Sequence, residues 1–157
     1  MFFFKNNYQK SQSATKVKFR PPQEARKLAA KLLHSKGLEE ERQELSDDLL
    51  DVLADCAQLD IVKLKISETN QYHKKKGGRV VYKRYGYYKP DTKYIYIQNR
   101  TAVRGQILAP KTFIDTLLHE WMHHYDSQKL GLNSIHTKGF YMRIKDLKKK
   151  LGLLDNV

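Results

Sequence analysis

Cysteine is the scarcest reactive residue of this chain, because Cys56 is the only one in 157 residues. A single thiol excludes both an intramolecular disulfide framework and a zinc ribbon built on several cysteines. Long apolar runs are also lacking. The three phenylalanines after Met1 are too few for a signal peptide, and no stretch approaches the roughly 20 apolar residues of a membrane span. We therefore expect a cytoplasmic protein with no membrane partner.

Acidic residues are the second scarce class, with 17 Asp and Glu against 30 Lys and Arg, which gives a formal net charge of +13. The excess is segregated, because residues 61–104 carry a net charge of +10 whereas residues 38–60 carry −8. A concentrated basic region favours polyanionic partners, nucleic acid above all. The alternative is a solvated basic surface without a specific partner.

Apolar spacing organises the chain into helices and strands. Residues 1–20 are polar and basic with little periodicity, so we interpret them as a loose basic arm ahead of a single domain at residues 21–157. Four segments have helical spacing and begin near Glu24, Glu39, Pro110 and Thr137. Alternating, β-branched or aromatic segments predict three strands, at 61–66, 79–82 and 94–97. This order predicts an α+β domain with helices packed on a small three-stranded sheet.

The predicted helix after Pro110 carries His119-Glu120-Trp121-Met122-His123, which is the pattern H-E-x-x-H. Histidines four residues apart lie on one helix face, so they can share a metal ion while the glutamate reaches a water molecule. At about 100° per residue, both histidines fall roughly opposite the apolar stripe of the helix. The pattern predicts a metallohydrolase with one Zn²⁺ per chain bound by His119 and His123.

A catalytic zinc takes three protein ligands, so one more side chain must come from outside this helix. His136 is the best candidate, because the short loop after Gly131 can return it to the first two histidines. Asp126 and His124 are the alternatives. Three ligands on one straight helix splay too far for a tetrahedron, so Asp126 is better placed as a carboxylate that orients a histidine. His124 points about 100° away from His123 and is interpreted as structural.

In such a site, Glu120 would accept a proton from a water molecule activated by the metal, and that water would attack a polarised carbonyl. Hydrolysis of an amide bond is the reaction that this arrangement predicts. Tyr141 and Arg143, which follow His136 closely, are candidates for the group that stabilises the oxyanion, with structural packing as the alternative.

Basic and aromatic residues are interleaved along residues 72–96. Basic groups bind phosphates, and aromatic rings stack on unpaired bases at about 1–3 kcal/mol each. The stretch predicts a DNA partner, with single-strand preference as the hypothesis, whereas tyrosines that only pack a sheet are the alternative. The candidate nucleic-acid contacts are Lys74, Lys75, Lys76, Arg79, Lys83, Arg84, Tyr85, Tyr87 and Tyr88.

Two segments together resemble a known family. The first is Thr116-Leu117-Leu118-His119-Glu120-x-x-His123, and the second is His136-Thr137-Lys138-Gly139-Phe140, which opens a basic helix. They resemble the SprT-like (Spartan-type) metalloprotease domain over about residues 90–151. The resemblance implies a zincin-like minimal protease fold, in which a strand such as 94–97 precedes the active helix and His136 is the third zinc ligand.

The same resemblance implies a zinc endopeptidase that acts on DNA-associated proteins, including covalent DNA–protein crosslinks, with DNA supplying recruitment or activation. It also implies a nucleoid-associated location in a bacterium or a nuclear one in a eukaryote. Two features depart from the family. Thr137 replaces the usual glycine, with Gly139 two places later, and the cysteine zinc ribbon that follows the domain in many relatives is absent.

Two other functions fit the sequence. One is a nucleic-acid-binding or regulatory module whose metal site stabilises the fold without turnover. The other is a zinc hydrolase for a different substrate class, such as cell-wall or small peptides. Imidazole ligands suit several divalent ions, so zinc is inferred from the motif.

Overall fold

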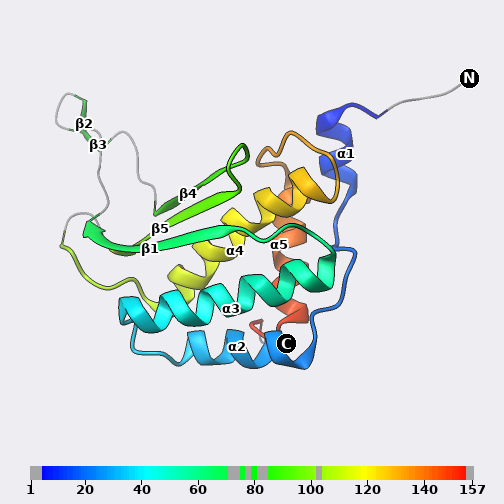
Figure 1. Cartoon of the computed structure of the whole chain (residues 1–157). Helices are drawn as coiled ribbons and strands as arrows, with labels where there is room; N and C mark the ends of the chain where they lie inside the picture. Colours follow the sequence, from blue (N-terminus) through cyan, green and yellow to red (C-terminus); the bar gives the residue numbers. More distant parts are fainter. Residues whose placement is uncertain (1–4, 71–74, 77–78, 81–84, 102–103, 155–157) are drawn as a thin grey trace, which may run out of the picture.

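The computed structural model describes residues 5–70, 75–76, 79–80, 85–101 and 104–154. It confirms the α+β class, with helices packed on a small mixed sheet (Figure 1). Among the described helices, none is long and apolar enough to cross a membrane. The helices are α1 (Asn7–Ser13), α2 (Gln23–Leu33), α3 (Glu39–Ala57), α4 (Pro110–Gln128) and α5 (Lys138–Lys150).

The main sheet has the strand order β1 (Lys63–Asn70), β5 (Tyr94–Arg100), β4 (Gly86–Lys89). Strand β5 runs parallel to β1 and antiparallel to β4. Helix α3 packs on β1, and α4 packs on β4 and β5, so both helices cover the same face of the sheet (Figure 1). Ile95 and Ile97 point into that covered face and are fully buried.

The third strand of the sheet differs from the prediction. Of the expected strand at 79–82, the structure describes residues 79–80, which form β3 (Arg79–Val80) and pair with β2 (Lys75–Lys76) in a separate two-stranded sheet. Strand β4 takes its place, because the turn at residues 90–93 folds β4 back along β5. Lys93 closes this turn in the left-handed region, with φ of +54°, and its N–H donates to the carbonyl of Pro90.

The core lies between α2, α3, α4, α5 and the sheet, and its centre is the apolar face of α4. Phe113, Leu117 and Trp121 of that face are fully buried. Burial of side chains of this kind contributes roughly 1.5–3 kcal/mol each, so the apolar face of α4 stabilises its position in the core. Pro110 begins α4, where a missing N–H costs no hydrogen bond. The helix that carries the predicted metal ligands is therefore rigidly anchored.

Residues 5–20 are part of the packed domain rather than a loose arm. Helix α1 begins with a capping box, in which Asn6 Oδ1 accepts from the Gln9 N–H and Gln9 Oε1 accepts from the Asn6 N–H. The helix then packs against α5, where the buried Arg143 donates to the carbonyls of Ser11 and Ala14 at 2.6 Å. These contacts are polar, so the sequence has no periodic apolar pattern that would predict them.

Candidate metal centre

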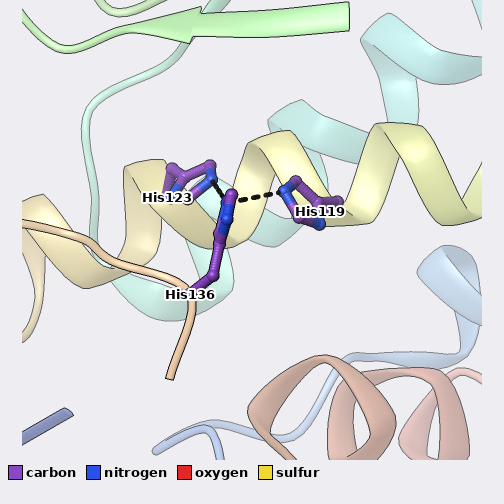
Figure 2. Close-up of side chains that lie close together, drawn as sticks. All are labelled: His119, His123 and His136. Atoms are coloured by element: carbon purple, nitrogen blue, oxygen red, sulfur yellow. Dashed lines mark hydrogen bonds between the residues drawn. The ribbon is translucent and has the colours of Figure 1, made fainter. Parts of the chain in front are cut away.

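Two elements bring three histidines together. His119 and His123 lie one turn apart on α4, on the side opposite the buried Trp121. His136 comes from the loop between α4 and α5. Figure 2 shows the three imidazole rings pointing toward one another across the space between the helix and this loop.

The spacing of the imidazole nitrogens fits a metal ion. Nε2 of His136 lies 3.1 Å from Nε2 of His119 and 3.1 Å from Nε2 of His123 (Figure 2). Around a tetrahedral zinc with Zn–N bonds of 2.0–2.1 Å, the ligand nitrogens lie about 3.3–3.4 Å apart. All three ligand nitrogens lie within 4.8 Å of one another, so the rings are close enough to share one ion. The structure brings together the three histidines that the sequence predicted as ligands.

A hydrogen-bond chain fixes the protonation of His123. Nδ1 of His123 lies 2.8 Å from the Ser134 hydroxyl, which donates its single proton to Asp126 Oδ2 at 2.8 Å. Ser134 must then accept from His123, so the imidazole proton resides on Nδ1 and the lone pair of Nε2 faces the other two rings. Asp126 orients a histidine, as predicted, but through Ser134 rather than directly.

Arg143 completes this chain and is not an oxyanion partner. The side chain is fully buried and donates to both carboxylate oxygens of Asp126, at 2.9 Å and 2.7 Å. Burial raises the pKa of Asp126, and the hydrogen bonds from Arg143 and Ser134 oppose that rise. Tyr141, the other candidate, is 51% exposed, with its ring centre 6.0 Å from that of His136.

Phe140 forms an apolar floor beneath the histidines. Its fully buried ring is stacked on His123, with centroids 4.6 Å apart, and meets His119 edge-on at 5.0 Å. Burial, reinforced by the neighbouring imidazoles, lowers the pKa of His119 to about 4 and that of His123 to about 3. Both rings are therefore neutral at physiological pH, which is the form that binds metal.

Glu120 lies beside the histidines at a pocket of about 720 Å³. Its side chain is mostly buried, with 8% of its surface exposed. The pocket lies between α4 and strand β4, which supplies Gly86 and Tyr88 to its wall, while Ser134 and His136 close it from the loop before α5. The arrangement puts a carboxylate, three imidazoles and the edge strand of the sheet around one cavity.

Comparison of the chain with models of known families, with curated proteins and with solved structures found no match. The function is therefore inferred from the geometry of the three histidines and Glu120. The family resemblance of the two motif segments stays a prediction.

His124 is structural, as predicted. The side chain is fully buried, and its Nε2 lies 2.7 Å from the carbonyl oxygen of Asp60, which can only accept a hydrogen bond. Nε2 is therefore protonated, and Nδ1 accepts from the Tyr88 hydroxyl at 2.8 Å. Burial raises the pKa of Tyr88 to about 12, which keeps that hydroxyl protonated as a donor.

The predicted nucleic-acid contacts that the structure describes lie on several elements. Tyr85 and Tyr88 line the pocket and pack against the core, and their contact with bases stays a prediction. Tyr87 lies on the opposite face of β4. Lys75 and Lys76 form β2 and Arg79 begins β3, whereas Lys74, Lys83 and Arg84 lie outside the described residues.

The residues that hold the His136 loop were not predicted from the sequence. Asn7 of α1 donates to the carbonyl of Asn133 at 2.7 Å and accepts from its N–H at 2.9 Å. Thr137 caps α5 by accepting from the Phe140 N–H, and its hydroxyl lies 2.6 Å from that of Ser11. The capping-box spacing of Asn6 and Gln9 was the available signal for α1.

Proposed function

We propose that this chain is a zinc-dependent endopeptidase of the SprT-like, zincin type, acting on DNA-associated or DNA-crosslinked proteins. The observation that supports this best is the convergence of three Nε2 atoms beside Glu120 in one pocket. His119, His123 and His136 would hold the zinc. When bound, zinc would supply a Lewis acid that polarises a carbonyl and makes a water molecule more acidic.

The residues of the chain then have separate roles in the proposed reaction. Glu120 accepts the proton of the attacking water and returns it to the amine that leaves when the peptide C–N bond breaks. Ser134 and Asp126 hold His123 in the tautomer that faces the other two imidazoles. Phe140 excludes water from the inner side of the rings.

A peptide substrate is supported by the position of β4. Among the described strands, β4 pairs only with β5 and therefore lies at an edge of the main sheet. Peptides often bind by adding a strand to such an edge. Because β4 also lines the pocket, a strand added there would lie beside Glu120. The net charge of +13 supports substrates that are associated with DNA.

The first test measures zinc in dialysed protein by elemental analysis, with the wild type beside His136→Ala and Glu120→Gln. We expect one zinc per chain in the wild type and in Glu120→Gln, and much weaker retention in His136→Ala. Cleavage is then followed on a protein crosslinked to a DNA oligonucleotide, with the free protein as a second substrate. Glu120→Gln should cut at least about 100-fold more slowly, because it removes the base but keeps the ligands.

The alternative functions give different results. A regulatory module with a structural metal site would retain zinc and cleave nothing in either the wild type or Glu120→Gln. A hydrolase for unrelated small peptides would cleave without stimulation by DNA, and added salt would not change its rate through loss of DNA binding.

A further inference from the structure

The outer face of the main sheet carries a cluster of tyrosines and lysines. Helices α3 and α4 cover one face, and no described helix covers the other (Figure 1). Three half-buried tyrosines share this outer face: Tyr94 and Tyr96 of β5, and Tyr87 of β4. We call these three residues the tyrosine face.

Strand register arranges the outer face in rows. In the first row, Tyr94 lies between Lys63 of β1 and Lys89 of β4. In the second row, Tyr96 lies between Lys65 and Tyr87. Side chains directly opposite one another on neighbouring strands lie on the same face. Each row therefore places aromatic rings beside one or two ammonium groups.

The rings form a continuous aromatic surface. Tyr87 and Tyr96 are stacked, with centroids 5.2 Å apart and planes 16° apart, and the ring of Tyr94 follows at 6.2 Å from Tyr87. Ile95 and Ile97 of the same strand point to the other face and are fully buried in the core.

The charges around these rings are mainly positive. Lys63, Lys65 and Lys89 are exposed, and Lys89 Nζ lies 5.4 Å from the Tyr87 ring centre. Lys65 also meets Glu39, but at 3.9 Å and with 56% of its side chain exposed, so this ion pair is weak.

We propose that the outer sheet face binds single-stranded nucleic acid, whose unpaired bases stack on Tyr87, Tyr94 and Tyr96 while Lys63 and Lys89 contact its phosphates. Bases in a duplex are stacked on each other and do not offer their faces to a protein sheet. Aromatic rings flanked by lysines are the combination that binds single strands without sequence preference.

This site is distinct from the metal centre, and β4 connects the two. Tyr87 and Lys89 point to the outer face, whereas Gly86 and Tyr88 of the same strand line the pocket. A protein attached to the bound strand would thus be held near the edge where peptide is proposed to enter. Nucleic-acid binding itself needs no zinc and no cleavage, so the inference stands independently of the proposed function.

The test uses the full chain and a fluorescent oligothymidine of about 12 nucleotides, a length within the span that one such surface covers. Binding is measured by anisotropy, beside a duplex of the same length. The single strand should bind more tightly than the duplex. The double variant Tyr94→Leu with Tyr96→Leu should weaken single-strand binding by at least about 20-fold, whereas Tyr94→Phe with Tyr96→Phe should stay within about 3-fold of the wild type.

Lysine variants test the phosphate contacts without touching packed rings. Lys63→Gln with Lys89→Gln should lower the salt dependence of binding by about 1.4 in the slope of log affinity against log salt, since each phosphate contact on a single strand contributes about 0.7. The matched control is Lys27→Gln with Lys31→Gln on the exposed side of α2, which removes the same charge. This control should leave the slope unchanged.

Three results would overturn the inference: a duplex bound as tightly as the single strand, a folded leucine variant that binds like the wild type, or a control pair as damaging as Lys63 and Lys89. If circular dichroism shows that the leucine variant does not fold, the inference is tested by comparing the Lys63 and Lys89 variant with its Lys27 and Lys31 control. Glu120→Gln should bind the oligonucleotide like the wild type. Binding without any cleavage would therefore count against the peptidase and leave this inference intact.

Discussion

At the scale of single residues, Ser134 sets which nitrogen of His123 faces the metal position. Ser134→Ala removes the acceptor of the Nδ1 proton, which lets the imidazole rotate or change tautomer, and removes one of the two donors to Asp126 Oδ2. We predict zinc binding weakened by about 10- to 100-fold with the fold retained, measured by competition with a chromophoric chelator. Ser127→Ala, at a serine of the same pocket, is the matched control and should bind zinc normally.

Equal zinc affinity in Ser134→Ala and in Ser127→Ala would contradict a positioning role for Ser134. A loss of affinity together with a lower melting temperature would instead assign Ser134 to stability. Circular dichroism of the zinc-free variants separates these two outcomes.

Some residues of the candidate site could be predicted from the sequence, and others could not. His119, Glu120 and His123 follow from spacing alone, because four residues make about one turn of a helix. The prediction of His136 as a ligand required only that the short loop before it return toward α4. Ser134 and Arg143 could not be assigned, because their roles depend on where Asp126 is buried, and nothing in their own sequence positions indicates it.

At the scale of elements, α1 restrains the loop that carries His136. The backbone of α1 approaches α5 most closely at Gly139. A Cβ at residue 139 would lie 2.0 Å from the carbonyl oxygen of Ser11 and 2.8 Å from that of Gln12. We predict that Gly139→Ala displaces α1 from α5, lowers the free energy of unfolding by about 1–3 kcal/mol, and weakens zinc binding through the loosened loop. Denaturant unfolding and hydrogen exchange of α1 measure this.

Lys138→Ala is the control for that substitution, because its exposed side chain precedes Gly139 in the same first turn of α5. It should leave both stability and hydrogen exchange in α1 unchanged. Unaltered protection of residues 7–13 in Gly139→Ala would mean that α1 does not depend on this close approach.

Elements with an apolar face were predictable, and the others were not. The four helices after residue 21 were predicted because each buries apolar residues at helical spacing, Leu117 and Trp121 of α4 among them. Helix α1 buries only Ser11 and is held by hydrogen bonds, so it has no such pattern. The third strand was misplaced because residues 79–82 have more strand character than β4, and only the turn at 90–93 selects β4.

At the scale of the whole molecule, the exposed face of α3 and the outer face of the main sheet differ in charge. The acidic face of α3 is exposed at Asp48, Asp51 and Asp55. The outer sheet face carries lysines. Since α3 packs on the covered face of the sheet, this polarity favours approach of a polyanion from the outer face.

Stability is also a property of the whole molecule, and the histidine cluster makes it depend on pH. The pKa of His119 falls from 6.5 to about 4 on folding, and that of His123 falls to about 3. Between these values and pH 6.5, the unfolded chain binds more protons than the folded one. The zinc-free protein should therefore lose stability as pH decreases from about 6.5 toward about 3.

Urea unfolding of the zinc-free protein across this range measures the slope, and His119→Gln with His123→Gln should flatten it. Burial raises the pKa of Asp47 and of Asp51, which contributes with the opposite sign, so the difference between variant and wild type is the quantity to compare. His34→Gln, at an exposed histidine after α2, should keep the wild-type slope. Parallel curves for the wild type and the double variant would show that the two buried histidines do not resist protonation, and that their readiness to bind metal at neutral pH must have another cause.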